Sequence, residues 1–307
     1  MKLVTFEADD GRVRPGVVRG AEVAAIDAPD MRAIYELGPD GMARIRSAKG
    51  PRYSLTEVRL LAPIIPKKFF HTSGNFREHA EESKRVGFSH KIAPWIVFFQ
   101  NVDAIVGPDA PIIYPRHLTH ELDHEIELAI VIKKSGKHFG PEEAMDYVGG
   151  YTIFNDITAR DIQRKEMESG IFCFCKAIDT FCPIGPWIVT PDEIPNPHGL
   201  RVELRVNGEP RQQSHMSRMW TTIPEIIAHY SPMGYSAGDL LSLGTVAGVA
   251  GFRVDAEDYY LRPGDVIECE IEGIGILRNP VVSWDQVYGT GQPTLGTLAA
   301  DEPRTEL

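Results

Sequence analysis

A switch from alternating to continuous apolar positions marks residues 124–132, which read His-Glu-Ile-Glu-Leu-Ala-Ile-Val-Ile. This pattern is typical of a strand whose first residues open into a site while the remainder enters a core. Glu125 and Glu127 are two residues apart, so their side chains point to the same face of the strand, about 6–7 Å apart. Two carboxylates at the mouth of a buried strand repel each other and lose hydration, and a bound cation or a shared proton would relieve that cost. The alternative is an edge strand with both glutamates in water, which the apolar run over 129–132 disfavours.

A second strand is predicted over residues 150–155, Gly-Tyr-Thr-Ile-Phe-Asn, and Asp156 follows at its end. A polar helix is then predicted over 157–169. The common role of an acidic residue between a strand and a helix is to cap that helix. With Glu125 and Glu127, Asp156 would instead complete a set of three acidic oxygen donors, which suits a hard cation, Mg²⁺ first, then Mn²⁺ or Ca²⁺.

The remaining pattern divides the chain into three parts. Residues 1–62 combine short strands and turn signals, typical of a small N-terminal α+β domain. An extended, proline-containing connector leads into a large domain over 63–280, because each proline disfavours helix around it. Residues 281–307 form a polar C-terminal tail.

The large domain is predicted to be rich in strands, which makes the expected fold class α+β. Asn207-Gly208 is a hairpin signal, because both residues tolerate the backbone of a tight two-residue turn. The other predicted elements of this domain are strands over 95–100, 183–189, 200–207 and 240–245 and a helix over 224–230.

A highly charged helix is predicted over residues 76–85. His79 and Glu82 are three residues apart and therefore neighbours on one helical face. Such a pair can be a surface contact on a solvated helix, or part of a lid that brings a base to a substrate. Lys176 poses a similar choice within the apolar stretch 172–178, because it can reach out to solvent or serve as a fixed positive charge.

Two further patterns point to other kinds of site. Three histidines precede the first strand and raise the alternative of zinc bound by His117, His120, His124 and Glu125. Their spacing is not that of the common zinc motifs, which disfavours this site. A glycine-rich loop over 244–251 lacks a final Lys-Ser/Thr and a following helix pattern, so a phosphate-binding loop is excluded.

The net charge of the chain bears on which kinds of molecule the protein binds. The formal net charge of -11 at pH 7 disfavours nucleic acids and anionic membranes. No apolar run approaches the length of a membrane span, and the first residues do not read as a signal peptide. We therefore expect a cytoplasmic protein that acts on a small molecule.

Four sequence blocks, taken together and in this order, are more specific than any one of them. They are Gly74-Asn75-Phe76-Arg77-Glu78-His79 with Glu82; His124-Glu125-Ile126-Glu127-Leu128; Asp156-Ile157-Thr158-Ala159-Arg160-Asp161-Ile162-Gln163; and Gly244-Thr245 with Gly248-Val249. With these blocks, the chain resembles the fumarylacetoacetate hydrolase family over residues 63–280. The resemblance implies a β-rich fold of mixed, rolled sheets around a central metal site, and assembly as a homodimer.

The resemblance also implies a role for each matched position. Glu125, Glu127 and Asp156 would bind Mg²⁺, Mn²⁺ or Ca²⁺, and His79 and Glu82 would activate water. Lys176 would stabilise developing negative charge. Arg160, Gln163 and Thr245 would contact the substrate's carboxylate or carbonyl oxygens. The chain departs from the family pattern in two places. The loop that is commonly Gly-Thr-Pro-x-Gly-Val-Gly has Val246 in place of the proline and Ala250 in place of the last glycine, and Gln100 stands where many relatives carry a lysine.

The expected function is therefore metal-dependent hydrolysis of a carbon–carbon bond in a 2,4-dioxo acid. An acylpyruvate such as fumarylpyruvate, or a related intermediate of aromatic catabolism, would yield pyruvate and a carboxylic acid. A cation that chelates the 2-oxo acid would stabilise the enolate that leaves. The alternative is an isomerase, hydratase or decarboxylase that acts on a 2-oxo dioic acid through the same enolate.

Overall fold

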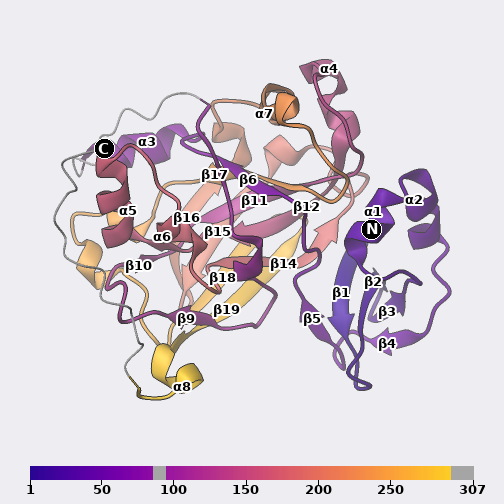
Figure 1. Cartoon of the computed structure of the whole chain (residues 1–307), viewed down its shortest axis with the longest axis horizontal. Helices are drawn as coiled ribbons and strands as arrows, with labels where there is room; N and C mark the ends of the chain where they lie inside the picture. Colours follow the sequence, from indigo (N-terminus) through magenta and orange to yellow (C-terminus); the bar gives the residue numbers. More distant parts are fainter. Residues whose placement is uncertain (86–94, 292–307) are drawn as a thin grey trace, which may run out of the picture.

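A mixed sheet of twelve strands runs through the part of the chain that the computed structural model describes, residues 1–85 and 95–291 (Figure 1). Its strands are β1 (Lys2–Glu7), β2 (Val13–Arg19), β3 (Glu22–Ala25), β4 (Arg52–Ser54), β5 (Arg59–Leu61), β6 (Phe69–Thr72), β7 (Val97–Phe99), β8 (Ile105–Val106), β11 (Ile126–Ile132), β12 (Val148–Asn155), β14 (Cys182–Val189) and β17 (Leu240–Thr245). The strand order is β4-β3-β2-β1-β14-β12-β11-β17-β6-β7, with β5 beside β1 and β8 beside β14.

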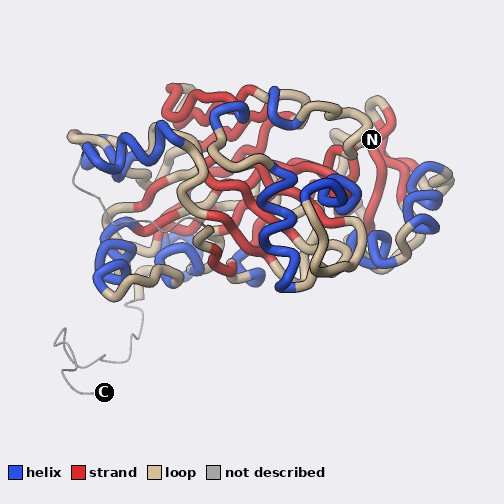
Figure 2. Tube along the Cα trace, turned by 90° about the horizontal axis from the view of Figure 1, so that it is seen from above, coloured by secondary structure: helices blue, strands red, loops and turns tan. Residues whose placement is uncertain are grey.

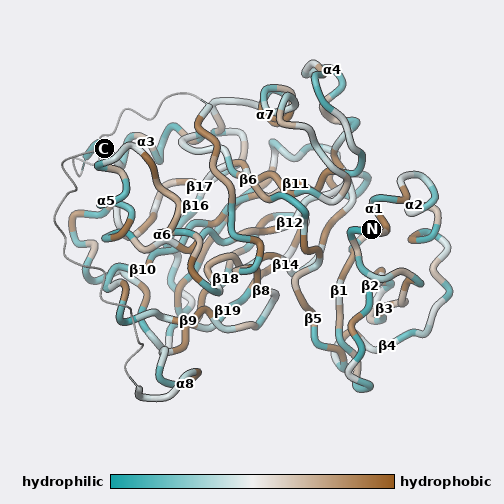
Figure 3. The backbone as a smooth tube through the Cα atoms, in the orientation of Figure 1, coloured by the Kyte–Doolittle hydropathy of each residue, from teal (hydrophilic) through white to brown (hydrophobic). Residues whose placement is uncertain are grey.

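The strands that carry the predicted carboxylates lie at the centre of this sheet. β11 pairs antiparallel with β12 on one side and with β17 on the other. Every residue of β11 and β12 is buried. Burial on both faces explains why these strands read as nearly continuous apolar runs, and Figure 3 shows such apolar stretches along the strands in the middle of the molecule.

A second sheet packs against the first and closes the core. Its strands, in order, are β16 (Glu209–His215), β15 (Arg201–Val206), β18 (Val266–Ile271), β19 (Gly275–Ser283) and β9 (Ile112–Tyr114). The apolar side chains of β15, β18 and β19 join those of β11 and β12 in one hydrophobic cluster. A short pair, β10 (Leu122–Asp123) with β13 (Thr158–Ala159), lies at the entrance to β11.

The N-terminal strands continue the large sheet. β1 pairs antiparallel with β14, where Lys2 lies opposite Val189. Residues from the N-terminal segment, such as Leu3 and Ile34, share a hydrophobic cluster with Phe154 of β12. The N-terminal segment is therefore joined to the centre of the molecule by both backbone pairing and apolar packing.

Short helices lie around the strands, as the view from above shows (Figure 2). They are α1 (Met31–Glu36), α2 (Pro39–Arg46), α3 (Arg77–Arg85), α4 (Pro141–Ala144), α5 (Arg160–Glu168), α6 (Phe174–Ala177), α7 (Ile223–Tyr230) and α8 (Trp284–Tyr288). Among the described residues, no helix is both long and apolar enough to cross a membrane.

The observed elements confirm the expected α+β, strand-rich fold. The strands predicted over 124–132, 150–155 and 240–245 are β11, β12 and β17. Asn207 and Gly208 form the tight turn between β15 and β16 with positive φ angles of 53° and 81°. The helix predicted over 157–169 begins later, at Arg160, because the two residues before it pair with β10.

Candidate metal-binding active site

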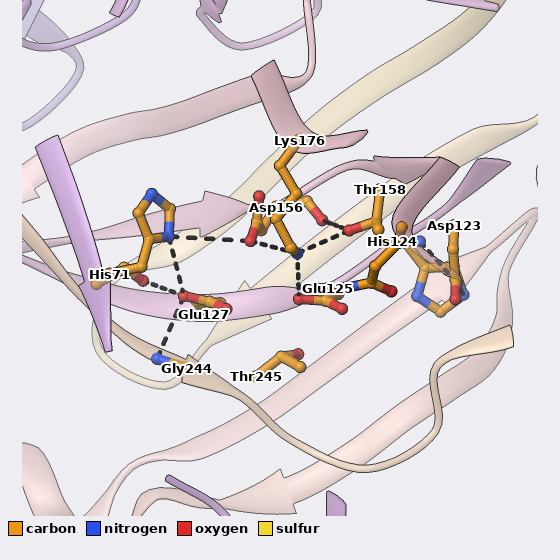
Figure 4. Close-up of polar contacts among 12 residues, drawn as sticks. His71, Asp123, His124, Glu125, Glu127, Asp156, Thr158, Lys176, Gly244 and Thr245 are labelled. Carbon is orange, nitrogen blue, oxygen red and sulfur yellow. Dashed lines mark hydrogen bonds and ion pairs between the residues drawn. The ribbon is translucent and has the colours of Figure 1, made fainter. Parts of the chain in front are cut away.

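Three carboxylates converge on one cavity at the start of β11 (Figure 4). Glu125 immediately precedes β11, Glu127 is its second residue, and Asp156 directly follows β12. The antiparallel pairing brings them together, because the backbone N–H of Asp156 donates to the carbonyl of Glu125 over 2.8 Å. All three side chains line the cavity, and none is more than 5% exposed.

Neither of the simpler roles considered for these carboxylates fits the structure. β11 is a central strand, so Glu125 and Glu127 are not the water-facing glutamates of an edge. Asp156 does not cap α5, because Ala159 occupies the N-cap position of that helix and makes no side-chain hydrogen bond there.

Lys176 points from α6 toward these carboxylates and not toward solvent. Its Nζ donates to Glu125 Oε2 over 3.0 Å, to Asp156 Oδ2 over 2.6 Å and to Thr158 Oγ1 over 2.8 Å. Burial favours the neutral amine, but the charges of Asp156 and Glu125 outweigh it and raise the pKa of Lys176. The side chain is therefore a fixed positive charge in a dry environment.

Burial and charge separate the protonation states of the three carboxylates. Burial raises the pKa of Asp156 to about 7, with Lys176 opposing the shift and Glu125 adding to it. Burial and the two neighbouring carboxylates raise the pKa of Glu127 well above its ordinary value. Burial alone would raise the pKa of Glu125 too, but the positive charges of Lys176 and Arg160 have the larger effect and lower it to about 2. Near neutral pH the cluster therefore keeps a proton on Glu127 and is partly protonated at Asp156, whereas Glu125 is ionised.

Arg160 holds Glu125 in place from the side opposite Lys176. The guanidinium donates to Asp123 Oδ2 over 2.8 Å, to Glu125 Oε1 over 2.6 Å and to Gln163 Oε1 over 2.9 Å. It is 1% exposed. Arg160 and Gln163, predicted to contact substrate, line the cavity, but the Arg160 guanidinium binds the protein itself and orients Glu125 in this structure.

Two further polar side chains of the site bond to the protein in the same way. Thr245, predicted to contact substrate, lines the cavity, but its hydroxyl donates to the carbonyl of Ile126 over 3.0 Å and accepts from Gln212 Nε2 over 3.0 Å. Gln100 donates from Nε2 to Asp156 Oδ1 over 3.3 Å. Gln100 thus contributes a neutral hydrogen bond to the carboxylate cluster.

His79 and Glu82 form a hydrogen-bonded pair on α3, and His79 lines the same cavity. His79 Nδ1 lies 2.8 Å from Glu82 Oε1, and the imidazole rests against the ring of Phe252 with centroids 5.0 Å apart. Glu82 Oε2 accepts the backbone N–H of Gly248 over 2.9 Å. The glycine-rich loop after β17 therefore fixes Glu82, which in turn orients His79.

Gly248→Ala is expected to weaken both the fold and this pair. The residue has φ of +109°, and an added Cβ would lie 2.2 Å from the carbonyl oxygen of Arg211. We expect a loss of about 1–3 kcal/mol in the free energy of unfolding, measured by urea titration. Turnover should also slow, because the clash with Arg211 displaces the loop and with it the backbone N–H that Glu82 accepts. Gly264→Ala is the matched control, since Gly264 has a similar φ of +103° and open space around it. Equal effects of the two substitutions would contradict a role for the Gly248 contact.

His71 lies beside the carboxylates, although the sequence analysis did not single it out. It stands on β6 and is fully buried, and its Nδ1 lies 3.9 Å from both Glu127 Oε2 and Asp156 Oδ2 (Figure 4). Burial, assisted by the charge of Lys176, lowers the pKa of His71 well below its ordinary value, so the ring is neutral. No local pattern marks this histidine, because it reaches the site through the parallel pairing of β6 with β17.

The histidines of the alternative zinc site serve other contacts. The ring of His117 packs edge-on against Trp284, with centroids 4.4 Å apart. His124 Nδ1 lies 3.1 Å from Gln212 Oε1. Within residues 1–85 and 95–291, the acidic and histidine side chains close enough to hold one metal ion are His71, Glu127 and Asp156. The zinc alternative is therefore not supported by this arrangement.

Comparison with known proteins places this site in a family. The profile described as fumarylacetoacetate (FAA) hydrolase C-terminal matches residues 68–282, and the profile described as Rv2993c-like, N-terminal, matches residues 1–63. The chain is 36% identical over 296 residues to the oxaloacetate tautomerase fahd2, mitochondrial, of Xenopus laevis, covering 92% of this chain and 90% of that one.

The chain is also similar to proteins whose structures have been solved. The fumarylacetoacetate hydrolase of Exiguobacterium antarcticum is 36% identical with a TM-score of 0.79, covering 92% of this chain and 99% of that one. The 5-carboxymethyl-2-hydroxymuconate delta-isomerase of Mycobacterium smegmatis is 32% identical with a TM-score of 0.73, covering 92% and 100%. The profile that spans the carboxylate cluster, the extent of the sequence match and the shared fold agree. The chain belongs to the fumarylacetoacetate hydrolase family.

Proposed function

We propose that this protein enolises a small 2-oxo dicarboxylic acid and so interconverts its keto and enol forms or two isomers. The observation that carries this proposal is one cavity lined both by His79, which Glu82 orients, and by a buried carboxylate cluster. The Xenopus relative is named as a tautomerase and the Mycobacterium structure as an isomerase. Both reaction classes move a proton within the substrate without net addition of water.

The carboxylate cluster fits a divalent cation, which Glu127 and Asp156 would hold because their oxygens lie close enough to share one ion. Glu125 lies beside them, and its two oxygens accept from Arg160 and Lys176. Glu127 accepts from Ser242 Oγ and from the N–H of Gly244, and no lysine or arginine of the described residues forms an ion pair with it. A buried carboxylate without such a partner is costly unless it is protonated or binds a cation. When bound, the cation would stabilise the negative charge that develops on the 2-oxo oxygen of the substrate.

His79 would move the proton. Glu82 engages Nδ1, which leaves Nε2 to take a proton from C3 of the substrate. The electron pair of the broken C3–H bond forms the C2=C3 double bond, and the carbonyl electron pair moves to the oxygen on C2. Return of the proton from His79 to that oxygen gives the enol, so substrate and product contain the same atoms. Glu82 stabilises the imidazolium between these steps.

The size and charge of the cavity favour a small dianion. Its volume of about 60 Å³ is several times the roughly 10–15 Å³ that one water molecule needs. Lys176 and Arg160 supply positive charge at the cavity wall, although the whole chain is acidic. Asp123 and Glu125 balance these two charges, so a bound divalent cation would add the positive charge that a carboxylate substrate meets.

Hydrolysis of an acylpyruvate is the second candidate. The observation that favours it is the orientation of His79 by Glu82, because the same base can draw a proton from a water molecule that attacks the C4 carbonyl. The Exiguobacterium relative is named as a fumarylacetoacetate hydrolase. Attack at C4 breaks the C3–C4 bond and releases pyruvate and a carboxylic acid.

Product-identified assays separate the two candidates. Enol oxaloacetate is added to the metal-loaded protein, its conversion is followed by ultraviolet absorbance, and the products are identified by proton NMR. Acceleration without release of a second acid supports enolisation. Conversion of acylpyruvates to pyruvate plus an acid, with no effect on enol oxaloacetate, supports hydrolysis instead. A panel of 2-oxo dicarboxylates and acylpyruvates with no turnover would reject both candidates.

The affinity for a divalent cation is expected to rise with pH up to about 7. The pKa of Asp156 is raised to about 7 and that of Glu127 is raised as well, so below neutral pH the cation must displace their protons. Each displaced proton makes the apparent affinity rise about tenfold per pH unit. Calorimetric titrations between pH 5.5 and 8, repeated in buffers of different protonation enthalpy, measure the affinity and count the protons released. An affinity that does not change over this range would contradict the protonation states described here.

A further inference from the structure

His71 occupies a place in the site that packing alone does not explain. Its ring is stacked between Phe69 and Phe98, with centroid distances of 4.6 and 4.5 Å, and Phe154 approaches it edge-on at 4.9 Å. An aromatic ring without nitrogen would fill this apolar slot equally well. The neutral imidazole instead brings two polar nitrogen atoms into a fully buried position.

The nitrogen atoms of His71 are unpartnered and one of them faces the carboxylates. Across residues 1–85 and 95–291, neither Nδ1 nor Nε2 finds a hydrogen-bond partner. Nδ1 lies 3.9 Å from Glu127 Oε2 and 3.9 Å from Asp156 Oδ2, with all three groups offering ligand atoms within 4.8 Å of one another. Figure 4 shows the ring beside these two carboxylates.

These separations suit ligands of a common ion better than hydrogen-bonded partners. A distance of 3.9 Å is too long for a hydrogen bond between nitrogen and oxygen. Ligand atoms that share one ion with bonds of about 2.1 Å lie roughly 3–4.2 Å from each other. Small side-chain shifts would therefore bring His71, Glu127 and Asp156 onto one cation.

We propose that His71 is a nitrogen ligand of the metal site, and that it makes the site select a first-row transition ion such as Mn²⁺ or Co²⁺ over Mg²⁺. The proposal rests on the metal-binding part of the proposed function. Imidazole nitrogen is a good ligand for transition ions, whereas Mg²⁺ and Ca²⁺ prefer all-oxygen sites. A mixed set of one imidazole and two or three carboxylates therefore departs from the all-carboxylate site that the sequence analysis predicted.

Spectroscopy of the wild-type protein tests the bond directly. The full chain is produced with histidine labelled with ¹⁵N, loaded with Mn²⁺, and examined by electron spin echo envelope modulation. A hyperfine coupling to histidine ¹⁵N is expected, because only directly bonded nitrogen couples strongly to the ion. Mn²⁺ that binds without any such coupling would overturn the proposal while leaving the carboxylate site intact.

Substitution then assigns the signal and tests selectivity. His71→Phe keeps an aromatic ring between Phe69 and Phe98 and removes both nitrogens. We expect it to lose the ¹⁵N coupling and to weaken Mn²⁺ and Co²⁺ binding by about tenfold or more, with Mg²⁺ affinity changed by less than about threefold. His198→Asn is the matched control, since His198 accepts the N–H of Ile223 away from the site and its loss leaves all three affinities unchanged.

The outcomes distinguish this proposal from the proposed function. Equal weakening of Mn²⁺ and Mg²⁺ binding by His71→Phe, or retention of the ¹⁵N coupling, shows that His71 is not a ligand. If His71→Phe does not fold, His71→Asn and the labelled wild-type protein still decide the question. Failure of the wild-type protein to bind any divalent ion would instead reject the metal site as a whole, and His71 with it.

Discussion

Glu127→Gln is expected to lower the affinity for divalent cations by about 100-fold or more and to slow turnover by about 10³-fold or more, because the site loses an anionic ligand at its centre. The amide can still accept from Ser242 and Gly244, so the fold should be retained. The pKa of Glu127 is raised well above its ordinary value, so the metal-free wild type already carries a neutral side chain there at neutral pH. Calorimetric metal titration, steady-state kinetics and thermal unfolding of the metal-free protein measure these three expectations.

Glu268→Gln is the matched control for this substitution. Glu268 and Glu270 repeat the Glu-x-Glu spacing on β18, but they lie partly exposed and form ion pairs with Arg205. Exposed ion pairs of this kind contribute little to stability. We expect wild-type metal affinity and turnover for the control. Wild-type metal affinity in Glu127→Gln would place the cation elsewhere and remove the basis of the proposed function.

His79→Ala is expected to reduce kcat by about 10²–10⁴-fold, because the proton loses its carrier between C3 and the oxygen on C2. Glu82→Gln should cause a smaller loss, since it leaves the imidazole in place but weakens the charge that stabilises the imidazolium. Metal affinity should change by less than about threefold in both variants, because neither residue is hydrogen-bonded to the carboxylate cluster.

Glu81→Gln controls for the loss of a carboxylate on the same helix. Its side chain is on the exposed face of α3, next in sequence to Glu82. We expect turnover and its pH profile to match the wild type. Full turnover by His79→Ala, with metal affinity retained, would show that another group moves the proton, and would favour a mechanism in which the carboxylate cluster acts without the pair on α3.

The positions of the buried charges explain how two cations are held at the cavity wall of an acidic chain. Lys176 and Arg160 flank Glu125 and lower its pKa to about 2, although burial acts in the opposite direction. Asp123 in turn neutralises Arg160 and accepts the N–H groups of Ala250 and Gly251. The loop after β17 therefore orients both Glu82, through Gly248, and Arg160, through Asp123. Substitutions in this loop are therefore expected to affect both Glu82 and Arg160.

The local sequence pattern correctly predicts those structural features that depend on residues only a few positions apart. The alternation that becomes an apolar run over 124–132 predicts a strand that leaves a site and enters a core, and β11 is that strand. The three-residue spacing of His79 and Glu82 places them on one helical face, where they form a hydrogen bond. Asn207-Gly208 forms the turn of a hairpin, because few other residue pairs adopt its backbone angles readily.

Local periodicity and turn chemistry are thus enough to predict the strand-rich class, the two central strands and the carboxylates at their ends. The other side chains that line the site are brought there by contacts between distant segments. The parallel pairing of β6 with β17 brings His71 to Glu127 and Asp156, and the contact with Asp123 turns Arg160 onto Glu125. These arrangements depend on strand order and on the neutralisation of buried charge between segments far apart in the chain, and neither leaves a mark in local sequence.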